Sequence, residues 1–593
     1  MSWLAAHQNA DGGWGDTVKS ISNISTTMLA RAAFHLAGAA GQYADSLQKS
    51  ERYLHEYFGE ATEQIAEAVR ARYGKDRTFS VPILMTAALA GLVDWKEVPP
   101  LPFELACLPQ AWFRYLKIPV VSYALPALIA IGQAVYCHRP PRNPFTRMIR
   151  ALSRKRSLRV LESIQPSSGG FLEATPLTSF VTIALASIGL SEHPVARKAV
   201  EFLVKSVRPD GSWPIDSNLA TWVTTLAVNA LAAAAELDGL DRKTELREWL
   251  ERQQYKERHP YTAADRGGWA WTDLPGGVPD GDDTPGALLA VSHLMGYVTA
   301  EDPEPASPRA FIRWSLEGSP DGQEVIERLP PTKDIPWAAR PHILSGLWWL
   351  LRLQNADGGW PTFCRGWGHL PFDRSGADLT AHALRALAAW KSQCAADQTY
   401  LRHLTAGIGT KTLPGFPLPD VSSEIDVGLA YLERTQRPDG SWIPLWFGNQ
   451  YVRNDENPTY GTARVLAAYR DLDMMNSEPA RRGIDWLVAA QNRDGGWGGA
   501  PGVPSSIEET ALAVEVLLDA EPQAEDAVNK GLGWLVEQAD AGGLENPTPI
   551  GFYFAKLWYF EKLYPIIFTV AALGRACRML STRHDPAHPE SAP

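Results

Sequence analysis

An internal repeat organises this chain of 593 residues. An aromatic–leucine pair is followed about ten residues later by Gly-x-Trp, and five copies end at Trp14, Trp213, Trp360, Trp442 and Trp497. In four of these copies a Gln lies six residues before the Trp, and two weaker copies end at Phe171 and Trp269. Because a repeated unit must bury its apolar face against the next unit, this pattern constrains the architecture more than any other feature does.

Each copy predicts a helix that ends in a tight turn. Before Trp442, the residues Val427, Ala430 and Tyr431 recur at helical spacing, and Gln436 follows them. The next segment, Arg-Pro-Asp-Gly-Ser, favours a turn because Pro presets one backbone angle and Gly supplies a positive φ. We expect the Gln to bind free backbone groups at the helix end and the Trp to pack beside it. The repeat residues are therefore predicted to be structural.

The stretches between the repeats predict an all-α fold. Segments such as 224–237 and 510–520 are rich in Ala and Leu, which form helices readily. No run alternates apolar and polar residues for long enough to indicate a sheet. Stacked helical hairpins form either an open solenoid or a closed α–α barrel. The repeats are irregularly spaced, with a long gap from Trp269 to Trp360, which favours the closed barrel.

Composition limits the function classes. The length predicts two domains, and the net charge of −11 argues against a nucleic-acid partner, which usually requires a basic face. The five Cys are scattered and form no C-x-x-C pair, so we predict reduced thiols in a cytoplasmic protein and no metal site. The first residues lack the basic and long apolar regions of a signal peptide.

One apolar segment leaves two readings open. Residues 118–135 are apolar throughout, but Pro119 and Pro126 interrupt them, and the segment is short for a transmembrane span. It can form either a buried helix or a monotopic patch that lies in one leaflet of a membrane.

The sequence P-D-G-D-D-T places Asp280, Asp282 and Asp283 within four positions. Carboxylates so close repel one another, and if they are partly buried at least one should stay protonated near neutral pH. A neutral carboxylic acid can donate a proton, so the cluster is a candidate general acid. A solvated acidic turn is the competing reading. A calcium loop of the EF-hand type is excluded because Pro285 occupies the position of its Gly.

The aromatic content indicates what the acid would protonate. The chain holds 22 Trp, 18 Tyr and 18 Phe against 8 Met. Aromatic faces stabilise cations, and they do so more strongly where water is excluded. An acid beside such faces suits the protonation of an alkene and the guidance of the resulting carbocation, which water would quench.

The repeats, the D-x-D-D motif at 280–283 and the segment D-L-T-A-H-A-L at 378–384 together resemble squalene–hopene cyclases. These are class II triterpene cyclases, which begin their reaction by protonation. The resemblance covers nearly the whole chain and implies two α–α barrels that enclose a central apolar cavity. It places the catalytic barrel at 1–15 plus 218–593 and the second barrel at 16–217. Members of the family are often homodimers and monotopic proteins, which favours a membrane contact at 107–135, on the inner face of the cell membrane.

The resemblance assigns the acid chemistry to four residues. Asp282 should protonate the terminal alkene, and Asp280 and Asp283 should flank and polarise it. His382 should form a hydrogen bond with Asp282 and tune its acidity.

The resemblance also implies a set of substrate-binding aromatic residues. These are Trp222, Trp271, Phe363, Trp446, Tyr460, Tyr553 and Phe560. Trp271 stands where the family usually has Phe, and Phe363 where it usually has Tyr. Farther from the acid, Pro549 replaces an expected Phe and Ala124 an expected Trp. We therefore expect an intact acid end and an altered far end of the cavity, which leaves product and substrate open.

The leading hypothesis is cyclisation of squalene to a polycyclic triterpene, without a metal or redox cofactor. Ionisation of a diphosphate would require D-D-x-x-D, which the chain lacks. The nearest alternative is a class II cyclase of hydroxysqualene, a polyprenyl diphosphate or a prenylated aromatic. A diphosphate should call for a basic cluster, to which Arg139, Arg142 and residues 154–156 could contribute. An alternative of another class is a non-catalytic isoprenoid-binding protein, although Asp282 and His382 are both retained.

Overall fold

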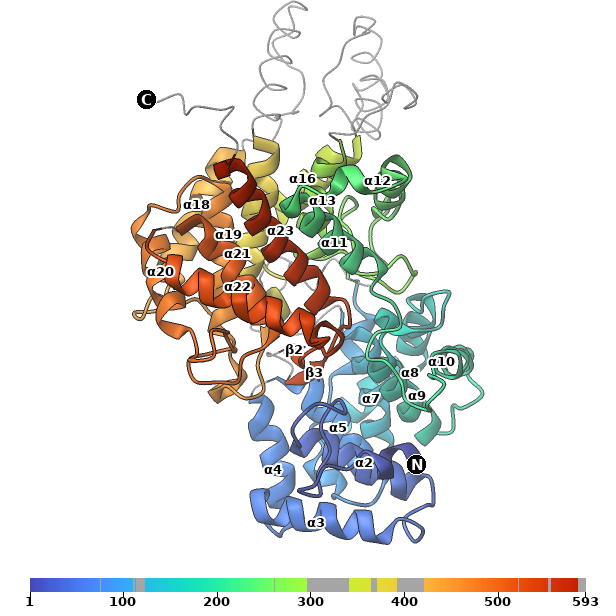
Figure 1. The fold of residues 1–593 in the computed structure, drawn as a ribbon. Helices are drawn as coiled ribbons and strands as arrows, with labels where there is room; N and C mark the ends of the chain where they lie inside the picture. Colours follow the sequence, from blue (N-terminus) through green and yellow to red (C-terminus); the bar gives the residue numbers. More distant parts are fainter. Residues whose placement is uncertain are drawn as a thin grey trace, which may run out of the picture.

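The computed structural model describes residues 1–74, 76–109, 112, 123–260, 262–295, 341–363, 371–391, 421–520, 522–552 and 556–584. These residues are mostly helical, which confirms the predicted all-α class. In Figure 1 the segments before about residue 210 form the lower part of the molecule, and the later segments form the upper part.

The lower part is built from consecutive helices. They are α1 (Ser2–Ala6), α2 (Ile24–Leu36), α3 (Ala44–Phe58), α4 (Thr62–Tyr73), α5 (Arg77–Leu89), α7 (Leu125–His138), α8 (Pro144–Ser163), α9 (Thr175–Ser187) and α10 (Pro194–Lys205). Three short 3₁₀ turns, η1 (Trp95–Glu97), η2 (Phe103–Cys107) and η3 (Phe171–Glu173), connect them.

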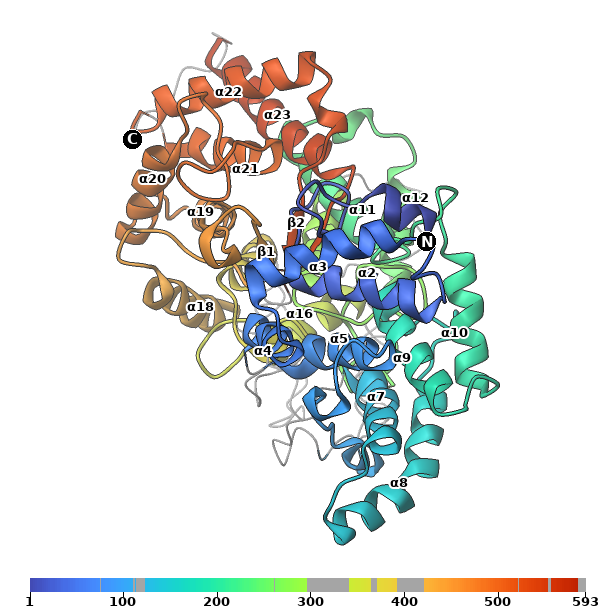
Figure 2. The same cartoon turned by 90° about the horizontal axis from the view of Figure 1, so that it is seen from below.

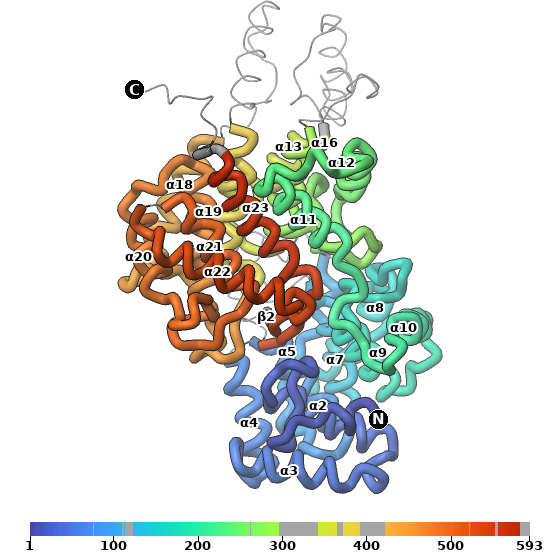
Figure 3. The backbone as a smooth tube through the Cα atoms, viewed as in Figure 1, coloured from blue at the N-terminus to red at the C-terminus, as the bar shows by residue number. Residues whose placement is uncertain are grey.

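The upper part continues the same construction. Its helices are α11 (Ala220–Ala234), α12 (Lys243–Arg252), α13 (Asp283–Met295), α16 (Pro341–Leu353), a helix over 377–391, α18 (Val421–Thr435), α19 (Pro458–Asp471), α20 (Glu478–Ala490), α21 (Ile507–Leu517), α22 (Glu525–Asp540) and α23 (Tyr564–His584). The last helix, α23, packs along α11 and α21, so the end of the chain closes against the beginning of this part (Figure 3).

Each part has its own hydrophobic core. The lower core joins side chains from α2 to α10, and the upper core begins at Trp222 and reaches Ala576. Val278 and Phe363 follow residue 210, in the segments of the upper part, but pack in the lower core, and the half-buried Trp271 contacts both cores. The segment that carries the D-x-D-D motif therefore runs along the junction of the two parts.

The repeats form staples between successive helices. The side-chain amide of Gln354 donates to the main-chain carbonyl oxygens of Gly358 (2.9 Å) and Glu424 (3.1 Å), and Trp360 Nε1 donates to that of Leu350 (2.8 Å). The same pair of carbonyl contacts recurs at Gln8, Gln165, Gln254, Gln436 and Gln491. The structural reading of the repeats is confirmed, with one addition: each Gln also reaches the first turn of the helix in the next unit.

A small antiparallel sheet, which the sequence did not indicate, lies near the centre. Its strands are β1 (Phe447–Gly448), β2 (Ile550–Phe552) and β3 (Leu557–Tyr559), in that order. Strands of two or three residues are too short for alternation to be legible. The N-terminal segment contacts this region, because the Trp558 amide donates to Asp16 and the Ile21 amide to Gln450 (Figure 2).

The first residues pack against other segments of the lower part. Trp14 packs against Phe34 of α2, with ring centroids 6.1 Å apart, and Trp3 donates to Asp210 beyond α10. The division into barrels at 1–15 plus 218–593 and at 16–217 stays a prediction.

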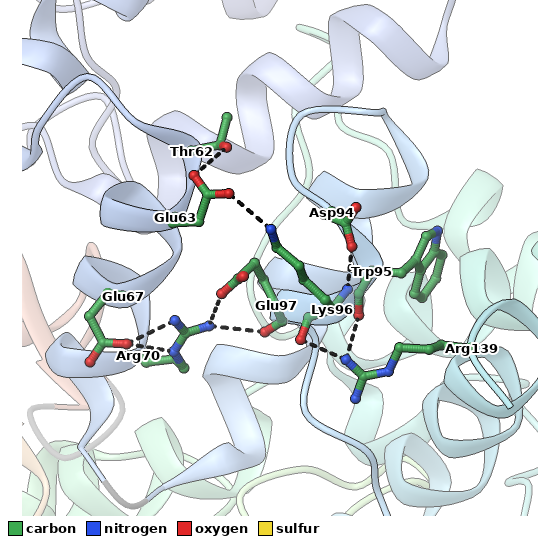
Figure 4. Close-up of polar contacts among 9 residues, drawn as sticks. All are labelled: Thr62, Glu63, Glu67, Arg70, Asp94, Trp95, Lys96, Glu97 and Arg139. Atoms are coloured by element: carbon green, nitrogen blue, oxygen red, sulfur yellow. Dashed lines mark hydrogen bonds and ion pairs between the residues drawn. The ribbon is translucent and has the colours of Figure 1, made fainter. Parts of the chain in front are cut away.

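A cluster of charged side chains braces one edge of the lower part (Figure 4). Lys96 lies 3.0 Å from Glu63 of α4, and Arg70 of α4 lies 2.9 Å from Glu97. Arg139, at the end of α7, donates to the main-chain carbonyl of Lys96 at 2.6 Å. The exposed pair of Lys96 and Glu63 contributes only ~0–1 kcal/mol, so we expect the cluster mainly to fix how α4, η1 and the end of α7 are placed.

The apolar segment 118–135 is divided. From Leu125 to Val135 it belongs to α7 and lies mostly in the lower core, which supports the buried-helix reading for this stretch. Residues 113–122 lie outside the described residues. No helix of the described chain is long and apolar enough to span a bilayer.

The buried carboxylate of Glu508, at the start of α21, predicts a pH-dependent stability. Burial, with the neighbouring Glu509, raises its pKa to about 8; Oε1 accepts the Thr548 amide, and Oε2 has no partner among the described residues. The folded state therefore retains a proton that the unfolded chain loses above about pH 4.5. We expect the free energy of unfolding to fall as pH rises from about 5 to 8, by at most ~1.4 kcal/mol per pH unit for this group.

Urea unfolding of Glu508→Gln across this pH range tests the expectation. The variant should show a shallower dependence than the wild type, whereas Glu545→Gln, at an exposed position, should not. Equal slopes in all three proteins would contradict the assignment.

Candidate active site

The acid motif lies where a loop enters α13. The Asp280 carboxylate accepts the backbone amides of Asp282 (2.8 Å) and Asp283 (2.7 Å), and its own amide donates to the carbonyl of Trp269 (3.0 Å). These contacts fix the conformation of the motif at the positive end of the helix dipole, where an anion is favoured.

The three carboxyl groups differ in their surroundings. Asp280 and Asp283 are almost fully buried, and burial raises the pKa of both. The charge of Asp280 raises the pKa of Asp283 further, so Asp283 is the group of this pair that retains a proton. Asp282 is the least buried of the three, with its side chain 16% exposed. It is the acid that a bound molecule could reach.

Asp282 contacts His382 directly. His382 Nδ1 lies 2.5 Å from Asp282 Oδ1, although the two residues are 100 positions apart in the chain. Burial lowers the pKa of His382, and the charge of Asp282 opposes this shift. Gly286 faces the imidazole: a Cβ there would stand 3.4 Å from Cε1 of His382, at van der Waals contact, and 3.2 Å from Thr225 Oγ1. The structure thus brings together the acid and the histidine that the resemblance paired.

Asp378, one helical turn before His382, has a role that sequence reasoning missed. Its buried carboxylate accepts the amides of Leu445 (2.8 Å) and Trp446 (3.1 Å), and burial raises its pKa to about 6. The same helix therefore holds His382 against the acid and anchors the loop that carries Trp446. The quoted D-L-T-A-H segment contained this residue, but nothing in its spacing pointed to a loop 67 residues later.

One aromatic group lies beside the acid–histidine pair. The Trp222 ring stands edge-on to the His382 ring, with centroids 6.5 Å apart, and its Nε1 donates to the Tyr564 hydroxyl at 2.7 Å. Tyr559 and Tyr564 share a hydrogen bond of 3.0 Å. Sequence reasoning singled out Trp222 but missed both tyrosines.

Tyr460 joins the same group through Phe447 of β1. The rings of Tyr460 and Phe447 are 4.8 Å apart, and Phe447 is 6.4 Å from Tyr564. The Arg464 guanidinium stands 5.6 Å from the centre of the Tyr460 ring.

A second aromatic group contains three more of the predicted residues. Phe363 lies 6.4 Å from Trp271 and 4.9 Å from Phe372, and Phe372 lies 6.0 Å from Trp446. Tyr123, which precedes α7, packs against Phe363 and Phe372. The groups are linked by the Trp222 amide, which donates to the carbonyl of Trp271 at 3.0 Å. Phe372 and Tyr123 were missed because no repeat or motif contains them.

Comparison with known proteins identifies the family. The model of the squalene–hopene cyclase N-terminal domain matches residues 1–150, and that of the C-terminal domain matches residues 372–578, which together cover more than half of the chain. The chain belongs to the squalene–hopene cyclase family. Members of this family are class II terpene cyclases, and the mostly helical fold of the described residues agrees with the α–α barrels of that class.

Individual relatives of this cyclase are distant. The squalene–hopene cyclase of Bradyrhizobium diazoefficiens is 23% identical over 95% of this chain and 85% of its own length. Enfumafungin synthase of Hormonema carpetanum is 24% identical over 94% of this chain, which spans only 42% of that protein. Drimenyl diphosphate synthase of Streptomyces showdoensis is 29% identical over 45% of this chain and 41% of its own length. The structure of ent-copalyl diphosphate synthase from Streptomyces platensis covers 97% of this chain and 91% of its own, with a TM-score of 0.47 and 17% identity.

Two predicted substrate-binding residues remain, Tyr553 and Phe560. Tyr553 lies outside the described residues. Phe560 is half-buried, with the Lys19 ammonium 5.5 Å from its ring centre, whereas its neighbour Tyr559 lies in the group beside Trp222. Among the residues described, no group of three His, Cys, Asp or Glu side chains is placed to hold a metal ion.

Proposed function

We propose that this cyclase protonates a terminal alkene of squalene through Asp282 and directs cyclisation to a polycyclic triterpene. The contact of Asp282 with His382 carries the proposal. The acid is the most accessible carboxyl of the motif, and its partner is buried and held in place.

In this mechanism the two oxygens of the Asp282 carboxyl have different roles. A lowered pKa favours neutral His382, which can donate its Nδ1 hydrogen to Oδ1 of Asp282. Oδ2 then carries the acidic proton and passes it to an alkene carbon, and the π electrons of that alkene form the new C–H bond. The resulting carboxylate keeps the hydrogen bond from His382, which stabilises the anion as the carbocation forms.

The aromatic groups support the later steps. Each ring closure uses the π electrons of the next alkene to form a C–C bond and moves the positive charge along the chain. The faces of Trp222, Phe363, Trp446 and neighbouring rings can stabilise this charge without reacting as a lone pair would. Loss of a proton or capture of water ends the sequence.

A prenyl diphosphate is the second candidate substrate. It is favoured by the identity over 45% of the chain with a drimenyl diphosphate synthase. The basic residues that could bind a diphosphate, Arg139, Arg142 and residues 154–156, support this candidate only in part. Arg139 is engaged with main-chain carbonyls, and Arg142, Lys155 and Arg156 are exposed on or beside α8.

Incubation of the purified protein in detergent with squalene, with products separated by gas chromatography and identified by mass spectrometry, tests the proposal. A cyclic isomer or hydrate of squalene supports it. Unreacted squalene with folded protein contradicts the squalene assignment. A parallel panel of hydroxysqualene, geranylgeranyl diphosphate and a prenylated aromatic then identifies which class the acid accepts.

We also propose that the cyclase binds the inner face of the cell membrane through α8. Phe145, Met148, Ile149 and Leu152 recur at helical spacing and are 64%, 52%, 37% and 76% exposed. Exposed basic side chains accompany them, and Arg156 and Arg159 line a shallow surface depression on the same helix. An apolar stripe flanked by cations is typical of a helix that lies in an anionic lipid interface.

Sedimentation with vesicles tests this membrane contact. The wild type should bind vesicles that contain anionic lipid and bind neutral vesicles less. Leu152→Glu should weaken binding at least ~10-fold, because a charge replaces apolar surface in the interface. Val204→Glu, on the exposed face of α10, is the matched control. Equal binding by all three proteins would contradict the contact. The homodimer implied by the family resemblance is checked on the same samples by light scattering.

A further inference from the structure

The segments that follow the two weak copies of the repeat meet each other beside the acid motif. The copy that ends at Phe171 keeps its staple, because Gln165 donates to the carbonyls of Gly169 (3.1 Å) and Val195 (3.0 Å). The next two residues, Leu172 and Glu173, both adopt positive φ angles, of 59° and 52°. This left-handed region favours glycine, so the turn is strained. Strain at a departure from an internal pattern is a pointer to function.

The strained turn directs a buried carboxylate toward the loop that follows the other weak copy. Glu173 is fully buried, and no cation among the described residues pairs with it. Its Oε1 accepts the amide of Gly276 at 2.9 Å and the hydroxyl of Ser168 at 2.7 Å, and its Oε2 accepts the hydroxyl of Ser217 at 3.3 Å. Gly276 belongs to the upper part of the chain and stands four residues before Asp280, so this contact crosses the junction of the two parts.

The loop that receives the carboxylate has little room to move. A Cβ on Gly276 would stand 2.6 Å from Glu173 Oε1 and 2.7 Å from the carbonyl oxygen of Gly170. The carbonyl of Gly277 accepts the Tyr255 hydroxyl at 2.6 Å, and the Asp280 amide is tied to Trp269. The segment from Gly276 to Asp280 is therefore held at its first residue by the lower part and at its last by the upper part.

We infer that Glu173 is a positioning residue for the acid motif, which fixes the approach of the Gly276–Asp280 segment and so the placement of Asp282 against His382. The inference rests on the proposed role of Asp282 as the proton donor. A residue of the lower part would then influence the reaction rate, because a displacement of the acid by about 1 Å can lower the rate ~10²-fold.

Kinetics of three variants test this role. Glu173→Ala should lower kcat by ~10- to 100-fold with KM within about twofold, because the loop loses its acceptor while the substrate contacts remain. Glu173→Gln retains an oxygen that can accept the Gly276 amide, so its kcat should be within about threefold of the wild-type value. Glu201→Ala, on exposed α10, should behave as the wild type. An unchanged kcat in Glu173→Ala, or a Gln variant as impaired as the Ala variant, would overturn the inference.

Hydrogen exchange supplies a readout that needs no substrate. The amide hydrogens of peptides spanning residues 274–283 should exchange faster in Glu173→Ala than in the wild type. In Glu173→Gln they should exchange at the wild-type rate. This outcome is independent of whether squalene is the substrate, so failure of the squalene assay and failure of the positioning role remain distinguishable. If Glu173→Ala does not fold, Gly276→Ala displaces the same contact from the other side and should give the same faster exchange; normal exchange there would overturn the inference.

Discussion

Replacing Asp282 with Asn is expected to lower the rate of cyclisation at least ~10²-fold, because the amide cannot donate the proton that starts the reaction. The amide oxygen can still accept from His382 Nδ1, and the buried network of Asp280 and Asp283 is untouched, so the fold should persist. The measurement is the initial rate with squalene, or with whichever polyprenyl chain the wild type converts, together with the thermal unfolding midpoint.

A control on the same loop separates proton donation from disturbance of the loop. Asp273→Asn removes an exposed carboxylate a few residues before the motif and should leave the rate within about twofold of the wild type. His382→Gln should fall between the two variants, since it removes the imidazole that fixes Asp282 but leaves the acid itself. Retained turnover by Asp282→Asn would show that another group supplies the proton and would remove the basis of the proposed mechanism.

Replacing Trp360 with Ala is expected to cause the largest loss of stability among single changes in the repeats. Trp360 is fully buried in the upper core, and its Nε1 donates to the carbonyl of Leu350 at 2.8 Å. Removal of a buried Trp costs ~3–5 kcal/mol through lost transfer energy and the cavity left behind. Because the entropy of unfolding grows with chain length, for a unit as large as the upper part the unfolding midpoint should fall by roughly 4–6 °C, as measured by calorimetry.

The chain contains its own control for this change. Trp213 occupies the equivalent position of another repeat and also donates to a main-chain carbonyl, that of Leu203 at 2.7 Å, but it is 51% exposed. Trp213→Ala should therefore cost under ~1.5 kcal/mol. Similar losses for the two variants would mean that the staple hydrogen bond, rather than burial, stabilises the repeats.

The sequence predicted the helical class and the staples because both depend on local patterns. Gln436 and Trp442 stand at a fixed spacing around a turn, and the bonds that they form differ little from one repeat to the next. The acid–histidine pair was also anticipated, but only through resemblance. Nothing in the spacing of Asp282 and His382 places residues 100 positions apart in contact.

The sequence could not supply the parts of the site that depend on tertiary packing. Tyr564 reaches Trp222 because α23 returns to α11, and the hairpin before α23 places Tyr559 against Tyr564. Asp378 holds the Trp446 loop through backbone amides that carry no sequence signature. Phe560 illustrates the precision that is needed. Tyr559, the last residue of β3, packs in the aromatic group, whereas Phe560, the next residue, lies beside Lys19.

The contact between the two ends of the chain constrains the order of events during synthesis. Asp16 accepts the amide of Trp558, 542 residues later, and Lys19 donates to the carbonyl of Pro547. The lower helices can fold as they leave the ribosome, but the central sheet and the tyrosines beside the acid cannot be completed until the last segment has emerged. A nascent chain would thus carry its acid motif through roughly the second half of its synthesis before Tyr559 and Tyr564 can join Trp222 beside it.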